Sequence, residues 1–148
     1  MISIETFRPR DLVDVMRLAS RTLPEEYPYD FYLQLSRAQG QHFRVARDVV
    51  DNSLVGFLVA AKEPGLQANV LLFAVDPAYQ GLGIGRALLR DAQRRLALDN
   101  VRQLRLEVRV DNRRAIRFYQ REGFDVAGLQ PGVYRDGADA VAMRKTLR

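Results

Sequence analysis

The chain contains no cysteine and only one histidine, His42. The absence of cysteine excludes a disulfide framework, a thiol nucleophile and thiolate metal ligands. A single histidine disfavours a histidine-rich metal centre. The sequence therefore predicts an activity that uses neither a metal nor a covalent thiol intermediate. His42 opens a predicted strand, and we expect it at the surface rather than in a site.

Long apolar runs are also missing from the sequence. No segment approaches the roughly 18 residues of a membrane-spanning helix, and the first residues lack the charged and apolar regions of a signal peptide. We therefore expect a cytoplasmic protein with no membrane contact. The 148 residues suffice for one core, and no linker, repeat or low-complexity segment divides them, so residues 1–148 are predicted to form a single domain.

Lysine is scarce, because only Lys62 and Lys145 contribute to the 23 basic residues and the rest are arginines. The formal net charge is +5. Arginine suits the recognition of phosphate and carboxylate groups, although we expect most of these side chains on solvated helix faces. No aromatic platform or recognition helix accompanies them, so the sequence disfavours nucleic acid as a partner.

The chain contains a regular succession of strand and helix patterns. Alternating or continuous apolar residues predict strands at 2–7, 43–48, 54–62, 68–75, 103–110, 124–129 and 138–147. Helical spacing predicts helices at 29–39 and 86–98, and at 11–23 and 112–122 if the capping residues Asp11 and Asn112 are counted. The order β-α-α-β-β-β-α-β-α-β-β predicts an α/β fold, a mixed twisted sheet of about seven strands with helices on both faces. The strand at 68–75 is apolar enough to be buried on both faces.

Three glycines, Gly81, Gly83 and Gly85, join the strand at 68–75 to the following helix. Such a connection is often only a tight turn, but its glycines also permit positive φ and close approach of a ligand to the backbone. The first helical N–H groups lack intrahelical acceptors, and Arg86 adds a positive charge, so the turn is suited to a pyrophosphate. The spacing matches neither a P-loop nor a dinucleotide-binding motif. Nucleotide hydrolysis and dinucleotide redox chemistry are therefore disfavoured.

The remaining pattern, Gln80-x-x-Gly83-x-Gly85, resembles the Q/R-x-x-G-x-G/A signature of the GNAT superfamily of acyl-CoA-dependent N-acetyltransferases. Residues 106–124, with the Asn112, Phe118-Tyr119 and Gly123-Phe124 elements, resemble the second conserved block of that superfamily in its RimI-type form. The resemblance extends over nearly the whole chain and implies a GNAT fold.

Two further segments resemble the catalytic subunits of the N-terminal acetyltransferase A class. Residues 23–27, Leu-Pro-Glu-Glu-Tyr, match their L-P-E-x-Y loop, and residues 134–140 are similar to their Y-x-D-G-E-D-A hairpin. The chain departs from this pattern at Val133, where relatives carry a second tyrosine, and at Ala138, where a glutamate is frequent. Both departures fall on the peptide side of the site.

The resemblance implies acetyl-CoA as co-substrate and no metal. Main-chain groups of the fourth strand and of the glycine loop are expected to hold acetyl-CoA, together with the side chains of Asn112 and Tyr119 in the helix at 112–122. The alternative role of these residues is core packing or, for Asn112, simple helix capping. The implied cofactor residues are Phe73, Ala74, Val75, Gln80, Gly81, Leu82, Gly83, Ile84, Gly85, Arg86, Asn112 and Tyr119.

The implied reaction is direct attack of an amine on the thioester, which requires no covalent nucleophile. Tyr119 is the candidate general acid toward the leaving sulfur, unless it only packs against the sheet. Glu107 and Glu25 are the candidate bases, and strand alternation leaves open that Glu107 merely pairs with an arginine. A carboxylate is about 3.5 pKa units more acidic than an α-amine, so a water relay or a raised pKa is needed.

The predicted acceptor is the α-amino group of protein or peptide N-termini, with ribosomal proteins as one option. At pH 7.4 about a quarter of α-amines are neutral, against about one lysine side chain in a thousand, so weak bases favour N-termini. By resemblance Glu25, Tyr27, Tyr134 and Asp139 line the peptide groove, unless the last three serve loop packing and hairpin capping. The alternatives are a small-molecule amine acetyltransferase and a non-enzymatic acyl-CoA-binding module. We expect a monomer or a weak homodimer.

Overall fold

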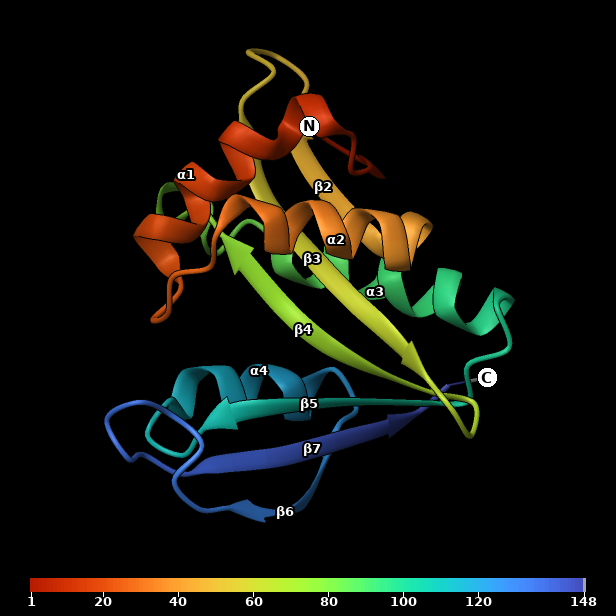
Figure 1. Ribbon diagram of the computed structural model, residues 1–148, viewed down its shortest axis with the longest axis vertical. Coiled ribbons are helices and arrows are strands. Elements are labelled where there is room, and N and C mark those ends of the chain that lie inside the picture. The colour runs from red at the N-terminus through yellow and green to blue at the C-terminus, as the bar shows by residue number, and fades with distance from the viewer. Residues whose placement is uncertain (148) are drawn as a thin grey trace.

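The computed structural model describes residues 1–147, which form a seven-stranded sheet of order β1-β2-β3-β4-β5-β7-β6 (Figure 1). The strands are β1 Ile2–Thr6, β2 Phe43–Asp48, β3 Leu54–Glu63, β4 Gln67–Val75, β5 Gln103–Arg109, β6 Asp125–Gln130 and β7 Ala140–Thr146. The helices are α1 Leu12–Thr22, α2 Tyr29–Gln39, α3 Ile84–Leu98 and α4 Arg113–Arg121, with short 3-10 turns η1 Pro9–Asp11, η2 Gly40–His42 and η3 Pro77–Tyr79. The predicted order of strands and α-helices is confirmed.

All neighbouring strands are antiparallel except β4 and β5, which are parallel because α3 connects them. This parallel pair is short: Gln67–Asn69 of β4 face Gln103–Arg105 of β5, and then the two strands diverge (Figure 1). The second half of β4 is therefore hydrogen-bonded to β3 on one side only. Its other edge opens into the gap between the two halves of the sheet.

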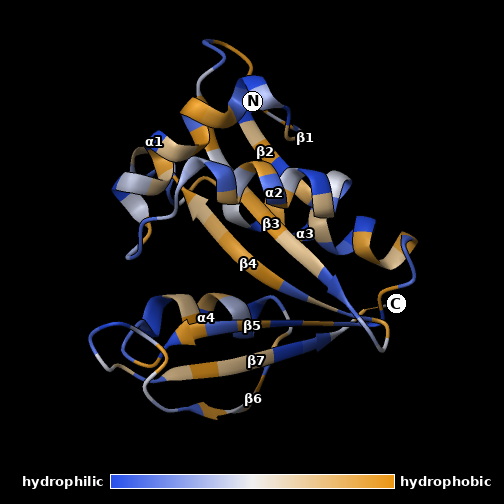
Figure 2. Cartoon of the chain, in the orientation of Figure 1, coloured by the Kyte–Doolittle hydropathy of each residue, from blue (hydrophilic) through white to orange (hydrophobic). Residues whose placement is uncertain are grey.

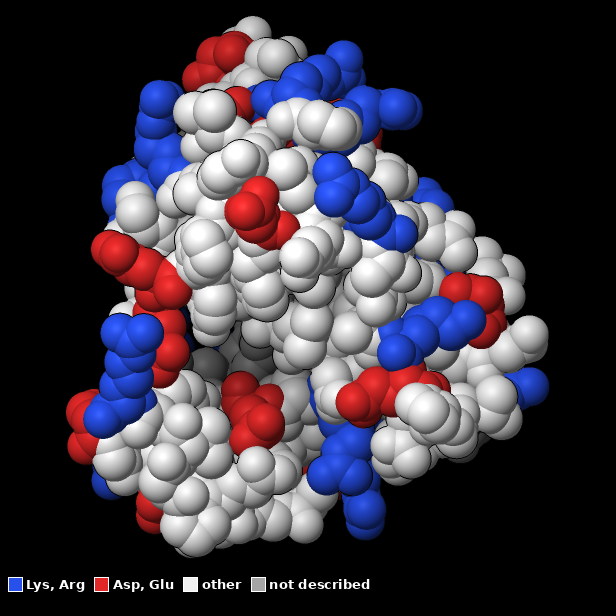
Figure 3. All heavy atoms as spheres, viewed as in Figure 1, with Lys and Arg blue, Asp and Glu red and all other residues white. Residues whose placement is uncertain are grey.

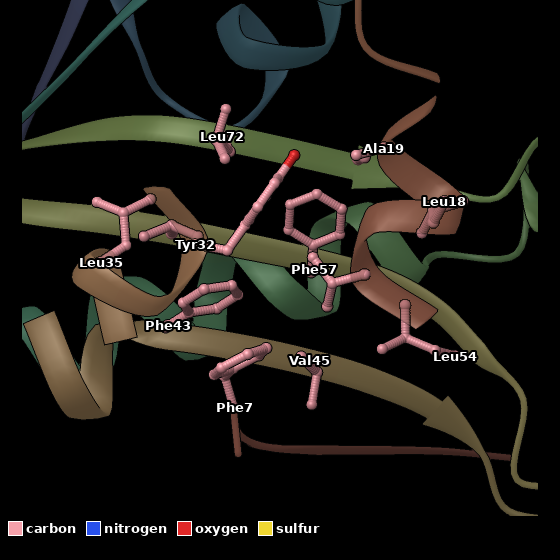
Figure 4. Packing of buried hydrophobic residues seen from close by; sticks show 13 residues of the cluster. Phe7, Leu18, Ala19, Tyr32, Leu35, Phe43, Val45, Leu54, Phe57 and Leu72 are labelled. Carbon is pink, nitrogen blue, oxygen red and sulfur yellow. The ribbon is translucent and has the colours of Figure 1, made fainter. Parts of the chain in front are cut away.

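The helices cover both faces of the sheet, because alternate side chains of the strands point to opposite sides. On β3, Phe57 and Val59 pack with α1 and α2, while Leu58 and Ala60 pack with α3. Figure 4 shows the first of these cores, in which Tyr32 and Leu35 of α2 lie over the aromatic rings of β2 and β3. Apolar residues accordingly concentrate along the central strands in Figure 2.

Helix ends agree with their predicted caps in one case and differ in another. The Asn112 side chain accepts a hydrogen bond from the Ala115 N–H at 3.2 Å and so caps α4 as predicted. Asp11 precedes α1, but its carboxylate bonds the Arg8 N–H and the Arg47 guanidinium instead of the helix. The expected side-chain cap at Asp11 is therefore wrong, because a neighbouring arginine competes for the carboxylate.

Two burial predictions are also wrong. The fourth strand is not buried on both faces, since Leu71 is 43% exposed at a bulge where β5 has already diverged. His42 is not at the surface but 3% exposed, with Nε2 2.8 Å from Asp99 Oδ2 at the end of α3. Both results depend on neighbours that are distant in sequence.

No helix within residues 1–147 is both long and apolar enough to cross a membrane.

Candidate active site

The open edge of β4 exposes main-chain groups at the centre of the molecule. The Asp76 N–H donates to the Val55 carbonyl of β3 at 2.8 Å. Because alternate N–H groups of a strand point to opposite edges, the N–H groups of Phe73 and Val75 point away from β3, toward the gap. The N–H of Ala74 points toward β3. Two of the three predicted strand residues thus present unpaired backbone to the opening.

The glycine loop after η3 has the predicted positive φ at two of its three glycines, whereas Gly85 lies within α3 and has none. Gly81 and Gly83 have φ values of 81° and 82°, and no atom lies within 4 Å of where their Cβ atoms would be. Within residues 1–147, the N–H groups of residues 81–86 meet no protein acceptor. Leu82 is exposed, whereas the Ile84 side chain packs in the core. The start of α3 is therefore a row of free donors in open space, which suits an anion.

Gln80 and Arg86 flank this loop and differ in their availability. Gln80 is exposed, and its N–H makes a long bond of 3.4 Å to the Pro77 carbonyl. Arg86 was predicted to contribute a full positive charge, but its Nε lies 3.1 Å from the buried Glu122 carboxylate, which also binds Arg90. The positive charge near the loop is therefore partly balanced by Glu122.

Tyr119 lies on α4 at the other side of the gap, against the end of β4. Its ring centroid is 6.3 Å from that of Phe73, 5.2 Å from that of Phe118 and 5.6 Å from that of Phe124. Burial, and secondarily Tyr134, raise the pKa of the Tyr119 phenol well above its usual range. The phenol is therefore protonated at neutral pH, and its ring has the packing role that the sequence left open.

A wall of acidic and phenolic side chains faces the opening around Tyr134. Burial raises the pKa of Tyr134, and the nearby charges of Glu107 and Glu25 raise it further, while Arg109 lowers it. Tyr27 belongs to the same group, since burial and Glu25 raise its pKa. Figure 3 shows this region as a hollow with acidic side chains at its rim. The structure thus brings together candidate residues that lie more than 100 positions apart.

The two candidate bases differ in their partners. Glu107 is exposed on the face of β5 opposite the buried Leu106 and Val108, as strand alternation predicted. It forms no ion pair with any residue of the described chain, so the alternative of an arginine partner is not observed. Glu25 lies 3.9 Å from the Arg135 Nε. Glu107 is therefore the less engaged carboxylate.

Arg109 was not singled out from the sequence, yet it anchors this wall. Its guanidinium binds Asp136 with contacts of 2.8 and 3.1 Å and Asp111 with contacts of 3.1 and 3.2 Å, and it lies 5.1 Å over the Tyr134 ring. These hydrogen bonds raise the pKa of Arg109 and lower that of both carboxylates. Arg109 and Asp136 are too far apart in sequence for any local pattern to indicate the contact.

Asp139 was predicted to line the groove, but its oxygens accept main-chain hydrogen bonds that hold the 130–140 segment in place. Its Oδ1 accepts a hydrogen bond from the Gly132 N–H and its carbonyl accepts one from the Val110 N–H, both at 3.0 Å.

A cavity of about 240 Å³ lies beside the wall, and it is lined by Met16, Ala19, Ser20, Glu25, Glu26, Tyr27 and Tyr32. Within residues 1–147, no three His, Cys, Asp or Glu side chains are grouped to hold a metal ion.

Free N–H groups, an unpaired strand edge, carboxylates and a protonated phenol are the kinds of group that suit transfer from a phosphate-containing carrier. The comparison with known families agrees. Residues 12–124 match the model of the acetyltransferase (GNAT) family, and the chain belongs to that family. It is accordingly an acetyl-CoA-dependent N-acetyltransferase, and the fold and enzyme class expected from the sequence are confirmed.

Several relatives are similar to this chain over nearly their whole length. The chain is 32% identical to an N-alpha-acetyltransferase of Saccharolobus solfataricus, with 98% of this chain and 93% of the relative covered. The crystal structure of Ard1 from Thermoplasma volcanium has a TM-score of 0.94 and 36% identity, covering 99% and 98% of the two chains. The ribosomal-protein-S18-alanine N-acetyltransferase of Escherichia coli has a TM-score of 0.86 and 27% identity, covering 99% and 94%.

Proposed function

We propose that this enzyme transfers the acetyl group of acetyl-CoA to the α-amino group of protein N-termini. The observation that carries the proposal is the joint presence of the open β4 edge, the donor row of the glycine loop and the Glu107–Tyr134 wall around one gap. Relatives that share the whole length of the chain act as N-alpha-acetyltransferases, which supports the acceptor assignment.

On the cofactor side, the diphosphate of acetyl-CoA binds the N–H groups of residues 81–86 beside Gln80 and is favoured by the dipole of α3. The free N–H groups of Phe73 and Val75 pair with the amide-rich arm of the carrier and with the acetyl oxygen. A donor to that oxygen lowers the barrier by about 3 to 4 kcal/mol, because negative charge develops there in the transition state. Asn112 caps α4 through its side-chain oxygen, so its amide nitrogen remains free for the same arm.

In the transfer step the neutral amine attacks the thioester carbon, the C–S bond breaks and the amine loses one proton. Glu107 takes that proton through water, because it is exposed and has no ion-pair partner among residues 1–147. An ordinary carboxyl is about 3.5 pKa units, or about 5 kcal/mol, too weak a base to deprotonate a protonated α-amine, so Glu107 takes instead the proton that becomes acidic as the carbon–nitrogen bond forms. Tyr119 donates a hydrogen bond to the departing sulfur. Because the pKa of its phenol is raised, this hydrogen bond is favoured over complete transfer of the proton to sulfur.

On the acceptor side, Tyr27, Tyr134 and Glu25 surround the entering N-terminus, and Asp139 shapes the hairpin that carries Tyr134. An α-amine suits this site better than a lysine side chain, since about a quarter of it is neutral at pH 7.4. Ribosomal proteins are one acceptor class within this proposal, as in the Escherichia coli neighbour. We place the reaction in the cytoplasm, with the enzyme as a monomer or weak homodimer.

Acetyl transfer to a defined panel tests the proposal. The panel holds peptides with a free N-terminus, the same peptides with a blocked N-terminus and an internal lysine, spermidine and an aminoglycoside. We expect transfer to the free peptides alone. Transfer only to the small amines would assign the alternative acceptor class. Titration calorimetry with CoA and acetyl-CoA tests the cofactor site separately, and absence of binding heat would refute it.

A further inference from the structure

A buried carboxylate outside the reacting groups joins the two helices of the site. Glu122 ends α4, three residues after Tyr119, and its side chain is 3% exposed. Its Oε2 accepts a hydrogen bond from Arg86 Nε at 3.1 Å, and its Oε1 accepts one from Arg90 Nε at 3.3 Å. The Glu122 carbonyl also accepts a hydrogen bond from Lys145 Nζ of β7 at 2.7 Å. Every oxygen of this residue is therefore engaged.

Glu122 links α3 and α4, two helices beside the gap in which β4 and β5 are no longer paired. β4 and β5 pair over only three residues, so the sheet itself constrains the far end of the gap weakly. α3 and α4 share one apolar cluster with both halves of the sheet, and Phe118 and Tyr119 of α4 reach Phe73 of β4. The contacts of Glu122 with Arg86 and Arg90 join α3 to α4 in addition to this apolar packing.

Both arginines donate to Glu122 through Nε. Their side chains are 55% and 59% exposed, although the carboxylate they share is buried. They stand in the first two turns of α3, next to the free N–H groups of the glycine loop. Two guanidinium groups are thus held beside the anion site with donors left for phosphate.

We propose that Glu122 is a positioning residue for the acetyl-CoA site. It holds Arg86 and Arg90 where they meet the phosphates of the carrier, and it keeps Tyr119 of α4 at a set distance from the glycine loop. The proposal rests on the cofactor site proposed above and is independent of which amine is the acceptor.

If Glu122 acted only through its charge, its removal would change the CoA affinity in the direction opposite to that expected from positioning. A negative charge near an anion site repels the ligand, so neutralising Glu122 without a positional effect would tighten CoA binding. Positioning predicts weaker binding, because a glutamine offers one oxygen for two arginines and places an N–H₂ group against the other. The direction of the change in affinity therefore separates the two roles.

Asp91 provides a matched control on α3. It is also a buried carboxylate, it binds Arg44 Nε at 2.7 Å, and it is approached by Arg94 and Arg95, but it lies two turns beyond the glycine loop. Glu122→Gln and Asp91→Asn both remove one buried charge from an arginine cluster. Only the first cluster adjoins the anion site.

Titration calorimetry with CoA on the wild type, Glu122→Gln and Asp91→Asn is the test, with circular dichroism to verify folding. We expect the dissociation constant to rise about tenfold in Glu122→Gln and to change less than about twofold in Asp91→Asn, while both variants melt at lower temperature. Unchanged or tighter binding in Glu122→Gln, or equal weakening in both, would overturn the proposal.

A second variant covers the case in which Glu122→Gln does not fold. Glu122→Asp keeps the charge but is one methylene shorter and reaches only one arginine, so we expect an intermediate rise in the dissociation constant. Wild-type affinity in Glu122→Asp would also overturn the proposal. If the wild type itself binds no CoA, the proposed cofactor site fails, whereas wild-type binding without a difference among the variants refutes the role of Glu122 alone.

Discussion

The Tyr119 side chain serves the core and the proposed reaction at once. Its ring packs among Phe73, Phe118 and Phe124, which fixes the direction of the hydroxyl. Burial raises the pKa of the phenol, which favours its protonated, hydrogen-bond-donating form. The same burial that stabilises the fold therefore prepares a hydrogen-bond donor for the leaving sulfur.

Tyr119→Phe separates these two roles. The ring packing persists, so we expect the thermal midpoint and the acetyl-CoA dissociation constant to stay close to those of the wild type. Loss of the hydroxyl lowers kcat by about 100-fold, within the range typical of one positioned proton donor. Steady-state kinetics and calorimetry measure both, and Tyr29→Phe, which removes an exposed hydroxyl, is the control. Wild-type kcat in Tyr119→Phe would exclude the hydroxyl from the mechanism.

The two glutamates are distinguished by their partners. Glu107 is free of ion pairs in the described chain, whereas Glu25 approaches Arg135 at the acceptor side. We expect Glu107→Gln to lower kcat about 100-fold and to keep only the fall in rate toward acid pH that protonation of the amine causes, because there is no longer a base to be inactivated by protonation. Glu25→Gln mainly raises the KM for the peptide. pH–rate profiles of both variants show which glutamate is the base. A larger loss of kcat in Glu25→Gln than in Glu107→Gln would identify Glu25.

At the scale of elements, the connection from β4 through the glycine loop to α3 is the proposed cofactor side of the site. The glycine spacing indicated where the backbone takes up positive φ, since positive φ at Gly81 and Gly83 is a local property of the chain. The opening beside it was not predictable, because it depends on where β5 leaves β4. The apolar pattern of β4 suggested burial on both faces and could not reveal the missing neighbour.

Gly83→Ala tests this element against a second glycine of matching conformation. Gly65, in the turn between β3 and β4, has a φ of 84°, close to the 82° of Gly83, and neither position is sterically closed to a Cβ. A left-handed alanine costs about 1–2 kcal/mol, so both variants lose similar stability in denaturant unfolding. Only Gly83→Ala should weaken CoA binding, by about tenfold or more. Equal CoA affinity in the two variants would place the anion elsewhere.

At the scale of the whole molecule, carboxylates on both halves of the sheet hold distant segments together. Asp99 at the end of α3 binds His42 of η2 and Lys62 of β3, and Asp136 holds the β6–β7 connection through Arg109. The hydrogen bonds from His42 and then Lys62 lower the pKa of Asp99, and those from Arg109 lower that of Asp136. Each carboxylate therefore stabilises the fold only while it is ionised.

Asp99→Asn tests this linkage by its pH dependence. A carboxyl whose pKa is lowered in the folded state stabilises above its unfolded value, near 3.9, and loses that effect as the pH falls through the lower folded value. We expect the variant to unfold at lower denaturant concentration than the wild type at pH 7. The two curves should converge as the pH falls below about 4. A difference that stays constant down to pH 2 would contradict the linkage.

The sequence by itself determined the order of strands and helices, the glycine loop, the cap of α4 and the family, because these depend on local backbone preference, apolar periodicity and short motifs. The tertiary structure alone decided the gap between β4 and β5, the burial of His42, the pairing of Arg86 with Glu122 and the anchoring of Tyr134 by Arg109. Each of these joins residues separated by tens of positions. Such contacts follow from how the packed elements meet in space, which no local pattern encodes.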